Sequence, residues 1–397
     1  MFKNYTKRQV AIITSSALGM CLEMMDIMFI AYALSSIMNE FNLSGKEAGF
    51  ISTATNLAML AGGLIFGFLA DRYGKIKVFS YSIIFFAVGT GLIFFANTYY
   101  WLILFRVLAG LGAGGEYGIG MSLIKDEFGN KNMGKYSSII AIFGQIGAAM
   151  AAILAGMLLA FGWRYLFLIG LVPVILAVVI RLKLDEAPIQ KSSKQEFLKA
   201  FKSNIYLSIA LSIMASIQIA GYFGMMNWLP KMAQTSLNLT SSSASYWMVS
   251  TIFGMSVGMW VFGKFFDRFG PRLSYAVFLL GSAALVFSFG LVSNYTELLI
   301  IGFIIGFFSN GMFAGYGALV NILYPANVSS SANNLIINTG RAVGGFSSVI
   351  IGILLDLYGS VVVVMGFLSA LYLISFCIML SLKELKYDKF LQLKEKN

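Results

Sequence analysis

Residues 67–74 read G-F-L-A-D-R-Y-G, and residues 263–270 read G-K-F-F-D-R-F-G. The second copy lies 196 positions after the first in a chain of 397 residues, close to half of its length. The same shift joins four further pairs of positions: Gly110 with Gly306, Gly144 with Gly340, Gln145 with Arg341, and Gly156 with Gly352. An internal repeat of this length predicts a protein built from two similar halves.

The composition indicates that both halves lie in a membrane. Apolar residues make up 58% of the chain, charged residues only 11%, and the mean hydropathy is +0.82. Soluble proteins carry about 25% charged residues, whereas a helix that crosses a bilayer needs about 20 consecutive apolar residues. We therefore predict an all-α polytopic membrane protein with twelve transmembrane helices in two pseudo-symmetric six-helix halves. The twelve apolar runs cover roughly 10–36, 48–70, 77–96, 98–124, 136–160, 163–182, 204–230, 243–266, 273–293, 297–323, 332–357 and 360–382.

The longest polar segment separates the two halves. It contains Phe197, Leu198 and Phe201, whose spacing fits a short helix on the membrane surface; a plain flexible linker is the alternative. The predicted domains are an N-terminal six-helix bundle (1–182), a cytoplasmic linker (183–203) and a C-terminal six-helix bundle with a cytoplasmic tail (204–397).

The charges give the orientation and exclude several classes of protein. The net charge is +11, and most of the 28 lysines and arginines fall in alternate loops and at the two ends, which predicts cytoplasmic termini in a cell membrane. The anionic inner leaflet, not nucleic acid, is then the expected polyanion. The first apolar run does not resemble a cleaved signal peptide. With no histidine and only Cys21 and Cys377, we expect no metal site, no cofactor and no disulfide.

The repeated loop has the residues of a latch. Gly67 lets a neighbouring helix approach closely, Asp71 can accept hydrogen bonds from a facing helix N-terminus, and Arg72 reaches the headgroups. A tight charged turn between antiparallel helices is the alternative for one copy, but two copies favour a gate. The second copy places Gly263, Asp267 and Arg268 at the matching positions.

Charged residues inside the apolar runs are the strongest chemical signal, because an ionised group at a helix centre costs about 2.5–3.5 kcal/mol on insertion scales. From the rise of about 1.5 Å per residue, Asp26 and Arg106 reach similar depths and are expected to pair. Glu23 lies three residues before Asp26, on a nearby part of the same helix face. The five residues are Glu23, Asp26, Arg106, Glu116 and Arg341.

Three acids against two arginines leave one negative charge in excess, so one carboxyl group is expected to hold a proton part of the time. Asp26 and Glu23 are the first candidates for proton coupling, and Glu116 is the next. A static ion-pair network that only joins helices is the alternative.

Arg341 is the only deep charge of the second half, and a guanidinium binds a carboxylate through two parallel hydrogen bonds. The predicted substrate is therefore a small organic anion. By depth, Glu116, Gln145 and Arg341 can share one layer. Each polar residue named here is alternatively a helix-packing contact. The predicted substrate-binding residues are Arg341, Arg106, Gln145, Gln218, Tyr222, Asn310 and Asn338.

These features resemble the major facilitator superfamily over essentially the whole chain. The loops match its G-x-x-x-D-R-x-G pattern, and R-V-L-A-G-L-G-A-G at 106–114 matches its R-x-x-x-G-x-G-x-G pattern. The resemblance implies a transporter in which one half rocks against the other around a central cavity. Residues 110–115 also fit G-x-G-x-x-G, but inside one apolar run they lack the strand, turn and acid of a dinucleotide site.

The strings G-L-G-A-G-G-E-Y-G (110–118), L-E-M-M-D (22–26) and N-T-G-R-A-V-G-G (338–345) resemble the metabolite, sialate and aromatic-acid proton symporter branches, which include niacin-type carriers. This resemblance favours Asp26 and Glu116 as cavity acids and Arg341 as an anion contact. The chain departs from these branches in the loops after spans four and ten. These branches usually have an acid, then a proline, then an arginine in each of the two loops. The first loop keeps the acid, Asp126, but has Gly129 and Met133 in place of the proline and the arginine. The second keeps the proline, Pro325, but has Ile322 and Ser329 in place of the acid and the arginine.

The sequence therefore predicts a proton-coupled symporter of a small organic anion, such as a monocarboxylate, aromatic acid or sugar acid, that works by alternating access as a monomer. A proton-driven antiporter or exporter of amphipathic compounds is one alternative, although span five lacks the Gly-Pro signature of drug/proton antiporters. A membrane sensor that has lost transport is another. An enzyme is not expected, because no pair of nucleophile and base stands out.

Overall fold

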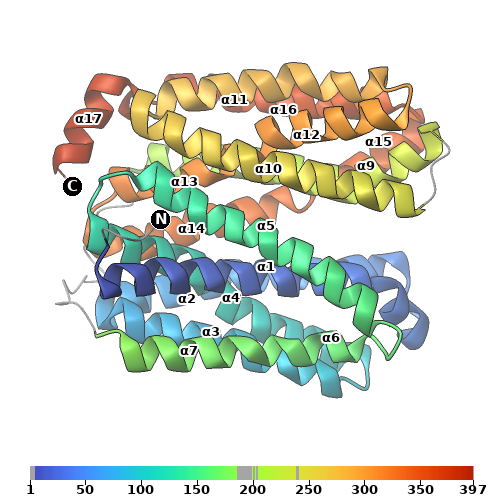
Figure 1. The fold of residues 1–397 in the computed structure, drawn as a ribbon, viewed down its shortest axis with the longest axis horizontal. Helices are drawn as coiled ribbons and strands as arrows, with labels where there is room; N and C mark the ends of the chain where they lie inside the picture. Colours follow the sequence, from blue (N-terminus) through green and yellow to red (C-terminus); the bar gives the residue numbers. More distant parts are fainter. Residues whose placement is uncertain (1–4, 186–198, 200–201, 203, 238–240, 397) are drawn as a thin grey trace. The chain divides into compact units, whose positions relative to one another are not determined.

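All regular elements in the described part of the chain are helices, as Figure 1 shows for this computed structural model. The structure describes residues 5–185, 199, 202, 204–237 and 241–396. The all-α prediction is confirmed over these residues. Most of the predicted linker, with the surface helix proposed around Phe197, Leu198 and Phe201, lies outside the described residues.

The helices follow the twelve apolar runs. Among the described residues, eleven helical stretches are long and apolar enough to cross a membrane. The sixth run is divided into α6, η2 and α7, with Pro173 in the first turn of α7, where a missing N–H removes no helical hydrogen bond. The first half contains α1 (Lys7–Phe41), α2 (Gly45–Tyr73), α3 (Lys75–Leu92), η1 (Ile93–Phe95), α4 (Tyr99–Phe128), α5 (Met133–Leu158), α6 (Arg164–Leu168), η2 (Ile169–Leu171) and α7 (Val172–Lys183).

In the second half, two of the predicted runs are each formed by two helices in succession. Run ten contains α12 and α13, and run eleven contains α14 and α15. The second half contains α9 (Ile205–Leu237), α10 (Ser241–Phe269), α11 (Pro271–Leu285), η3 (Val286–Leu291), α12 (Tyr295–Gly311), α13 (Phe313–Leu323), η4 (Ala326–Val328), α14 (Ser329–Gly344), α15 (Ser347–Tyr358), α16 (Val361–Ser381), η5 (Lys383–Leu385) and α17 (Tyr387–Lys396).

The first two helices begin at capping boxes. The Thr6 hydroxyl accepts a hydrogen bond from the Gln9 backbone N–H, and the Gln9 side chain accepts one from the Thr6 N–H, both at 3.1 Å. Ser44 and Glu47 repeat this arrangement at the start of α2. Each box satisfies two N–H groups that have no partner within the helix, which fixes where the long helices start.

Contacts divide the chain into two compact units. The first unit comprises residues 1–131, 139–204 and 324–338, and the second comprises 132–138, 205–323 and 339–397. Each half of the sequence thus contributes a short segment, the start of α5 or of α14, to the unit formed mainly by the other half. Positions 133 and 329, where α5 and α14 begin, are again separated by 196 residues. The domain boundaries predicted at 182 and 204 stay predictions.

The repeat is visible inside each unit. A Cβ atom on Gly110 of α4 would clash with the Thr55 carbonyl oxygen of α2, and one on Gly306 of α12 would clash with the Thr251 carbonyl oxygen of α10. These partners also differ by 196 positions. Because only glycine permits such close helix packing, α2 with α4 and α10 with α12 form the same tight pair in the two units.

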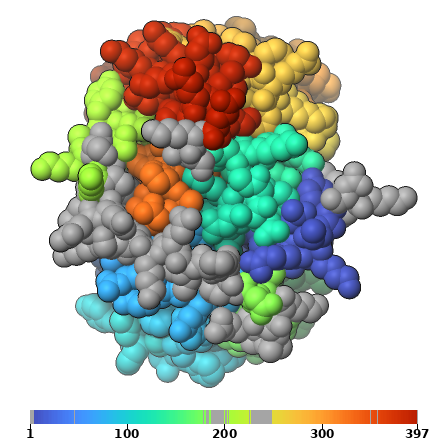
Figure 2. Space-filling view, turned by 90° about the vertical axis from the view of Figure 1, so that its left-hand side faces the viewer, coloured from blue at the N-terminus to red at the C-terminus, as the bar shows by residue number. Residues whose placement is uncertain are grey.

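The second unit carries the C-terminal helix on its surface. In Figure 2 the C-terminal residues (red) lie against yellow residues near the turn between α10 and α11. Phe390 of α17 is 2% exposed, and its ring meets that of Phe266 edge-on at 5.7 Å. The helix is therefore anchored by an aromatic contact next to the second copy of the repeated loop.

Candidate functional site

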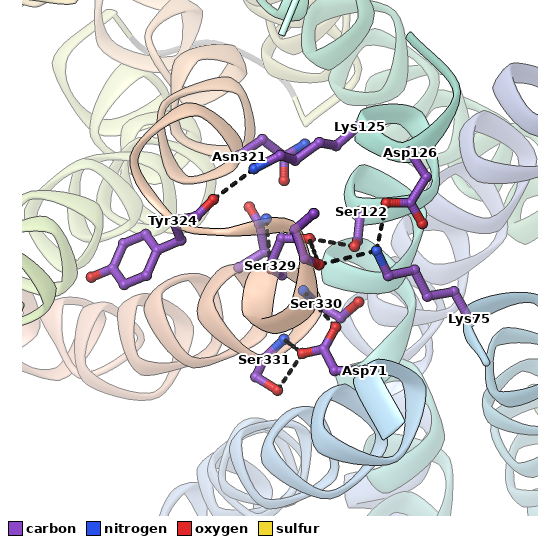
Figure 3. Close-up of polar contacts among 12 residues, drawn as sticks. Asp71, Lys75, Ser122, Lys125, Asp126, Asn321, Tyr324, Ser329, Ser330 and Ser331 are labelled. Carbon is purple, nitrogen blue, oxygen red and sulfur yellow. Dashed lines mark hydrogen bonds and ion pairs between the residues drawn. The ribbon is translucent and has the colours of Figure 1, made fainter. Parts of the chain in front are cut away.

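The first repeated loop holds the start of α14 within the first unit. Asp71, in the last turn of α2, accepts hydrogen bonds from the Ser330 N–H at 3.3 Å and from the Ser331 N–H at 2.9 Å (Figure 3). The Ser331 hydroxyl donates a third at 2.7 Å. The first N–H groups of a helix have no partner within it and carry positive partial charge, so a carboxylate is well placed there. The predicted contact of Asp71 with a helix N-terminus is confirmed.

The second repeated loop does the same in the second unit. Asp267 accepts hydrogen bonds from the Gly134 and Lys135 N–H groups, both at 2.9 Å, at the start of α5. These two donors stand 196 positions before Ser330 and Ser331. The predicted helix contact of Asp267 is confirmed, and the two latches obey the repeat residue by residue.

The glycines of the two loops permit close approach, as predicted, and the headgroup contact of the arginines stays a prediction. A Cβ on Gly67 would lie 2.9 Å from the Ser331 Cα, and one on Gly263 would clash with the Ser138 hydroxyl. Arg72 and Arg268 are exposed. Their guanidinium carbons lie 5.4 and 5.1 Å from the ring of the following aromatic residue, Tyr73 and Phe269.

Two lysines add contacts around the first latch that the sequence did not reveal. Lys75 Nζ donates to Asp126 at 2.8 Å and to the Ala326 carbonyl at 3.3 Å. Lys125 is 3% exposed, and its Nζ donates to the Tyr324 carbonyl at 2.6 Å. Both reach the segment just before α14 (Figure 3). They contribute charge near positions where the chain departs from the acid–Pro–Arg pattern.

The Ser122 and Ser329 hydroxyls form a further hydrogen bond between α4 and the first residue of α14. Neither serine stands out in the sequence, because the pairing depends on how α4 and α14 meet. Together with Asp71, Lys75 and Lys125, Ser122 is the fourth side chain that bonds to residues 324–331 in the first unit.

An ion pair lies in the core of the first unit. Arg106 Nη1 of α4 donates to Asp26 Oδ2 of α1 at 2.8 Å, and both side chains are buried. The Thr90 hydroxyl donates to Asp26 Oδ1 at 3.0 Å, and Arg106 Nε donates to the Thr55 hydroxyl at 3.3 Å. The predicted pairing of Asp26 with Arg106 is confirmed. The sequence analysis missed the two threonines, because threonine is common in apolar helices.

The other two predicted acids of the first unit are buried as well. Glu23 is 0% exposed and Glu116 is 2% exposed. A Cβ on Gly19 of α1 would lie 3.3 Å from Glu116 Oε2, so the carboxyl group of α4 reaches α1 at that glycine. Glu23 follows Gly19 by four residues, one helical turn further along the same face. The carboxyl groups at the span centres therefore outnumber the one arginine that this unit places there.

The second unit contains a separate polar contact. Gln218 Nε2 of α9 donates to Asn310 Oδ1 of α12 at 2.6 Å, and the Asn310 amide reaches the Met255 sulfur at 3.4 Å. Tyr222 is buried one turn after Gln218. Arg341 is only 6% exposed. Three of the predicted substrate residues thus lie together or on neighbouring turns.

The remaining predicted substrate residues belong to the first unit. Gln145 is buried in α5, and Asn338 of α14 donates to the Gly114 carbonyl at 2.7 Å. The layer expected from Glu116, Gln145 and Arg341 involves both units and stays a prediction. Among the residues that the structure describes, no cluster of three His, Cys, Asp or Glu side chains is placed to hold a metal ion.

Long apolar helices in two repeated sets, with buried charges at their centres, define a polytopic membrane transporter. Residues 16–349 match the Major Facilitator Superfamily, and the chain belongs to that family. It is accordingly a transporter and not an enzyme.

Relatives of known name support this assignment. The chain is 34% identical over 376 residues to a putative metabolite transport protein of Haemophilus influenzae, covering 91% of both chains. It is 28% identical to the cis,cis-muconate transport protein of Acinetobacter baylyi, covering 94% of both. The proton:xylose symporter XylE superimposes with a TM-score of 0.77 at 15% identity, over 97% of this chain and 99% of that one, which shows the shared fold.

Proposed function

We propose that this transporter imports a small organic acid together with protons. The observation that carries the proposal is the buried Asp26–Arg106 pair with two further buried acids in the same unit. Protonation of Asp26 removes the charge that holds Arg106. A proton can thereby change the internal contacts of the first unit, which is what coupling requires. Glu23 and Glu116 are the other candidate carriers.

The proposed substrate class follows from charge and from relatives. Arg341, buried in the second unit, is a bidentate partner for a carboxylate. A relative with 28% identity is named for transport of muconate, a dicarboxylate. Gln145, Gln218, Tyr222, Asn310 and Asn338 are the proposed polar neighbours of the substrate, and Arg106 is a further anion contact.

The two latches are the proposed gates. Asp71 and Asp267 each hold the start of a helix from the other half of the sequence, and their hydrogen bonds must break when the halves separate on the cytoplasmic side. Breaking them exposes helix N–H groups and carboxylates to water, which can solvate both. We propose a monomer in the cell membrane, with both termini in the cytoplasm.

The proposal can be tested in proteoliposomes that contain the purified protein. An inward proton gradient should drive accumulation of radiolabelled nicotinate or cis,cis-muconate, and collapse of the gradient with a protonophore should abolish it. Asp26→Asn combined with Glu23→Gln should leave only equilibration. Accumulation by this variant at the wild-type rate would refute the proposed coupling, and efflux driven by the same gradient would indicate an exporter.

A further inference from the structure

The start of α14 makes a second set of contacts in the first unit, deeper than the Asp71 latch. The Gly118 N–H of α4 donates to Asn334 Oδ1 at 2.8 Å, and Asn334 Nδ2 donates to the Gly115 carbonyl at 3.3 Å. One turn later, Asn338 Nδ2 donates to the Gly114 carbonyl at 2.7 Å. Two asparagines of α14 therefore bind the main chain of a single turn of α4.

The bonded groups are the two ends of one helical hydrogen bond. In a regular α-helix the N–H of residue 118 donates to the carbonyl of residue 114. Asn334 accepts from that N–H, and Asn338 donates to that carbonyl. Side chains rarely reach both ends of such a bond in the middle of a helix, because neighbouring side chains cover the backbone. Here that backbone is accessible because both positions are glycine.

Glycines form the walls of the groove that receives the asparagines. A Cβ on Gly118 would lie 2.7 Å from the Asn334 backbone nitrogen and would also clash with the Asn334 side chain. On α2, a Cβ on Gly63 would clash with Asn338 Nδ2, and one on Gly67 would lie 3.1 Å from Asn334 Nδ2. Both asparagines are buried, at 0% and 1% exposure. Because a Cβ on Gly118 would meet the backbone of Asn334 as well as its side chain, a larger residue there requires α14 to shift.

The equivalent place in the second unit has different residues, so the groove does not follow from the fold alone. There, Ser138 of α5 stands at the position of Asn334. Met259 of α10 and Ala314 of α13 replace Gly63 and Gly118. At these positions the wall residues are larger and the inserted side chain is smaller: the Ser138 hydroxyl donates to the Met259 carbonyl at 2.7 Å. Wall and inserted residue change together between the two copies.

We propose that Asn334 and Asn338, seated in the glycine-walled groove of α2 and α4, form a lock that holds the closed arrangement of the first repeated loop. While α14 is docked they are positioning residues, and the substrate contact proposed for Asn338 requires its amide to leave the Gly114 carbonyl. Because the repeat contains this lock only once, the first latch is the tighter of the two and must be released for α14 to leave. The inference rests on the alternating-access part of the proposed function but not on protons or on the identity of the substrate.

Glu116 connects the lock with the interior of the first unit. It extends from the same turn of α4, between the bonded Gly115 and Gly118, and reaches Gly19 of α1. When the asparagines leave, the main chain of this turn loses three hydrogen bonds. The surroundings of a buried acid therefore depend on whether α14 is docked.

Spin labels on either side of the groove test the lock without any substrate. Labels at Tyr73→Cys, at the end of α2, and Asn327→Cys, in η4, report docking in the full-length protein in nanodiscs, with the exposed Cys377 changed to Ser. Asn334→Ala with Asn338→Ala should raise the ratio of long to short distances by at least about tenfold, since three hydrogen bonds are lost and each accounts for a factor of roughly 2 to 10.

Gly118→Ala should cause the same shift from the opposite wall, although it leaves both asparagines intact. The matched control is Gly156→Ala on α5, where an added Cβ meets nothing within 4 Å. A lock requires both groove variants to shift the distances while the control does not. Unchanged distances in both variants would overturn the lock, even if acid uptake is intact. If the groove variants shift the distances as expected but the wild-type protein transports no organic acid, the proposed function is overturned and the lock is still supported.

Discussion

The substitution Asp26→Asn is the sharpest test of the buried ion pair. It removes the carboxylate that pairs with Arg106, whose side chain is 2% exposed. Breaking a buried pair by removing one partner costs about 3–5 kcal/mol, because the remaining charge stays desolvated. The asparagine can still accept the hydrogen bond from Thr90, so the loss belongs almost entirely to the arginine. We expect the free energy of unfolding to fall by about 3 kcal/mol.

The measurement is reversible unfolding in mixed detergent micelles, followed by tryptophan fluorescence. Asp26→Asn combined with Arg106→Gln removes both charges and should recover at least about half of the loss, because a neutral pair carries no desolvated charge. The control is Asp126→Asn, whose partner Lys75 is partly exposed, as is the acid itself, so the cost should stay below about 1 kcal/mol. A double variant no more stable than Asp26→Asn alone would refute the reasoning.

Three further substitutions probe other contacts. Asp71→Asn weakens the charge-assisted hydrogen bonds to the start of α14, at a cost of about 1.4 kcal/mol in the free energy of opening that turn. Deuterium exchange in peptides that cover the turn should therefore be about tenfold faster, and unchanged exchange would contradict the latch. Glu40→Ala removes the partner of Arg164, but the pair is partly exposed at 41% and 25%, and we expect less than about 1 kcal/mol in thermal unfolding. Phe390→Ala removes a buried aromatic ring and should lower the stability of the α17 contact by about 3 kcal/mol. The helix α17 should then become sensitive to limited proteolysis. Protection equal to that of the wild type would show that other contacts anchor the helix.

Much of the fold could be predicted because hydropathy and repetition act along the sequence. A bilayer requires long apolar helices, and eleven of the twelve apolar runs contain, among the described residues, a helical stretch long enough to cross it. The repeated loop also indicated the kind of partner: Asp71 and Asp267 can accept hydrogen bonds from a helix N-terminus, where the N–H groups carry positive partial charge. The repeat did not reveal which helix supplies them, since that depends on contacts between distant residues.

The candidate site was predicted less completely. Depth along a helix was enough to pair Asp26 with Arg106, because two opposite charges at one level in apolar surroundings have few other partners. Depth could not find Thr55 and Thr90, whose roles depend on rotation of the helices about their axes. It also could not show that the Asn338 amide is bonded to α4. Glycines that wall a groove look the same in sequence as glycines that pack helices.

Proton movement caused by the substrate is the most direct test of the central claim that organic acid transport and proton transport are one process. Proteoliposomes containing the wild-type protein and a trapped pH-sensitive dye are mixed with nicotinate or cis,cis-muconate, with no proton gradient imposed. The account predicts that the lumen acidifies as the acid enters, and that Asp26→Asn with Glu23→Gln abolishes this acidification. Entry of radiolabelled acid by the wild-type protein without a change in luminal pH would contradict it.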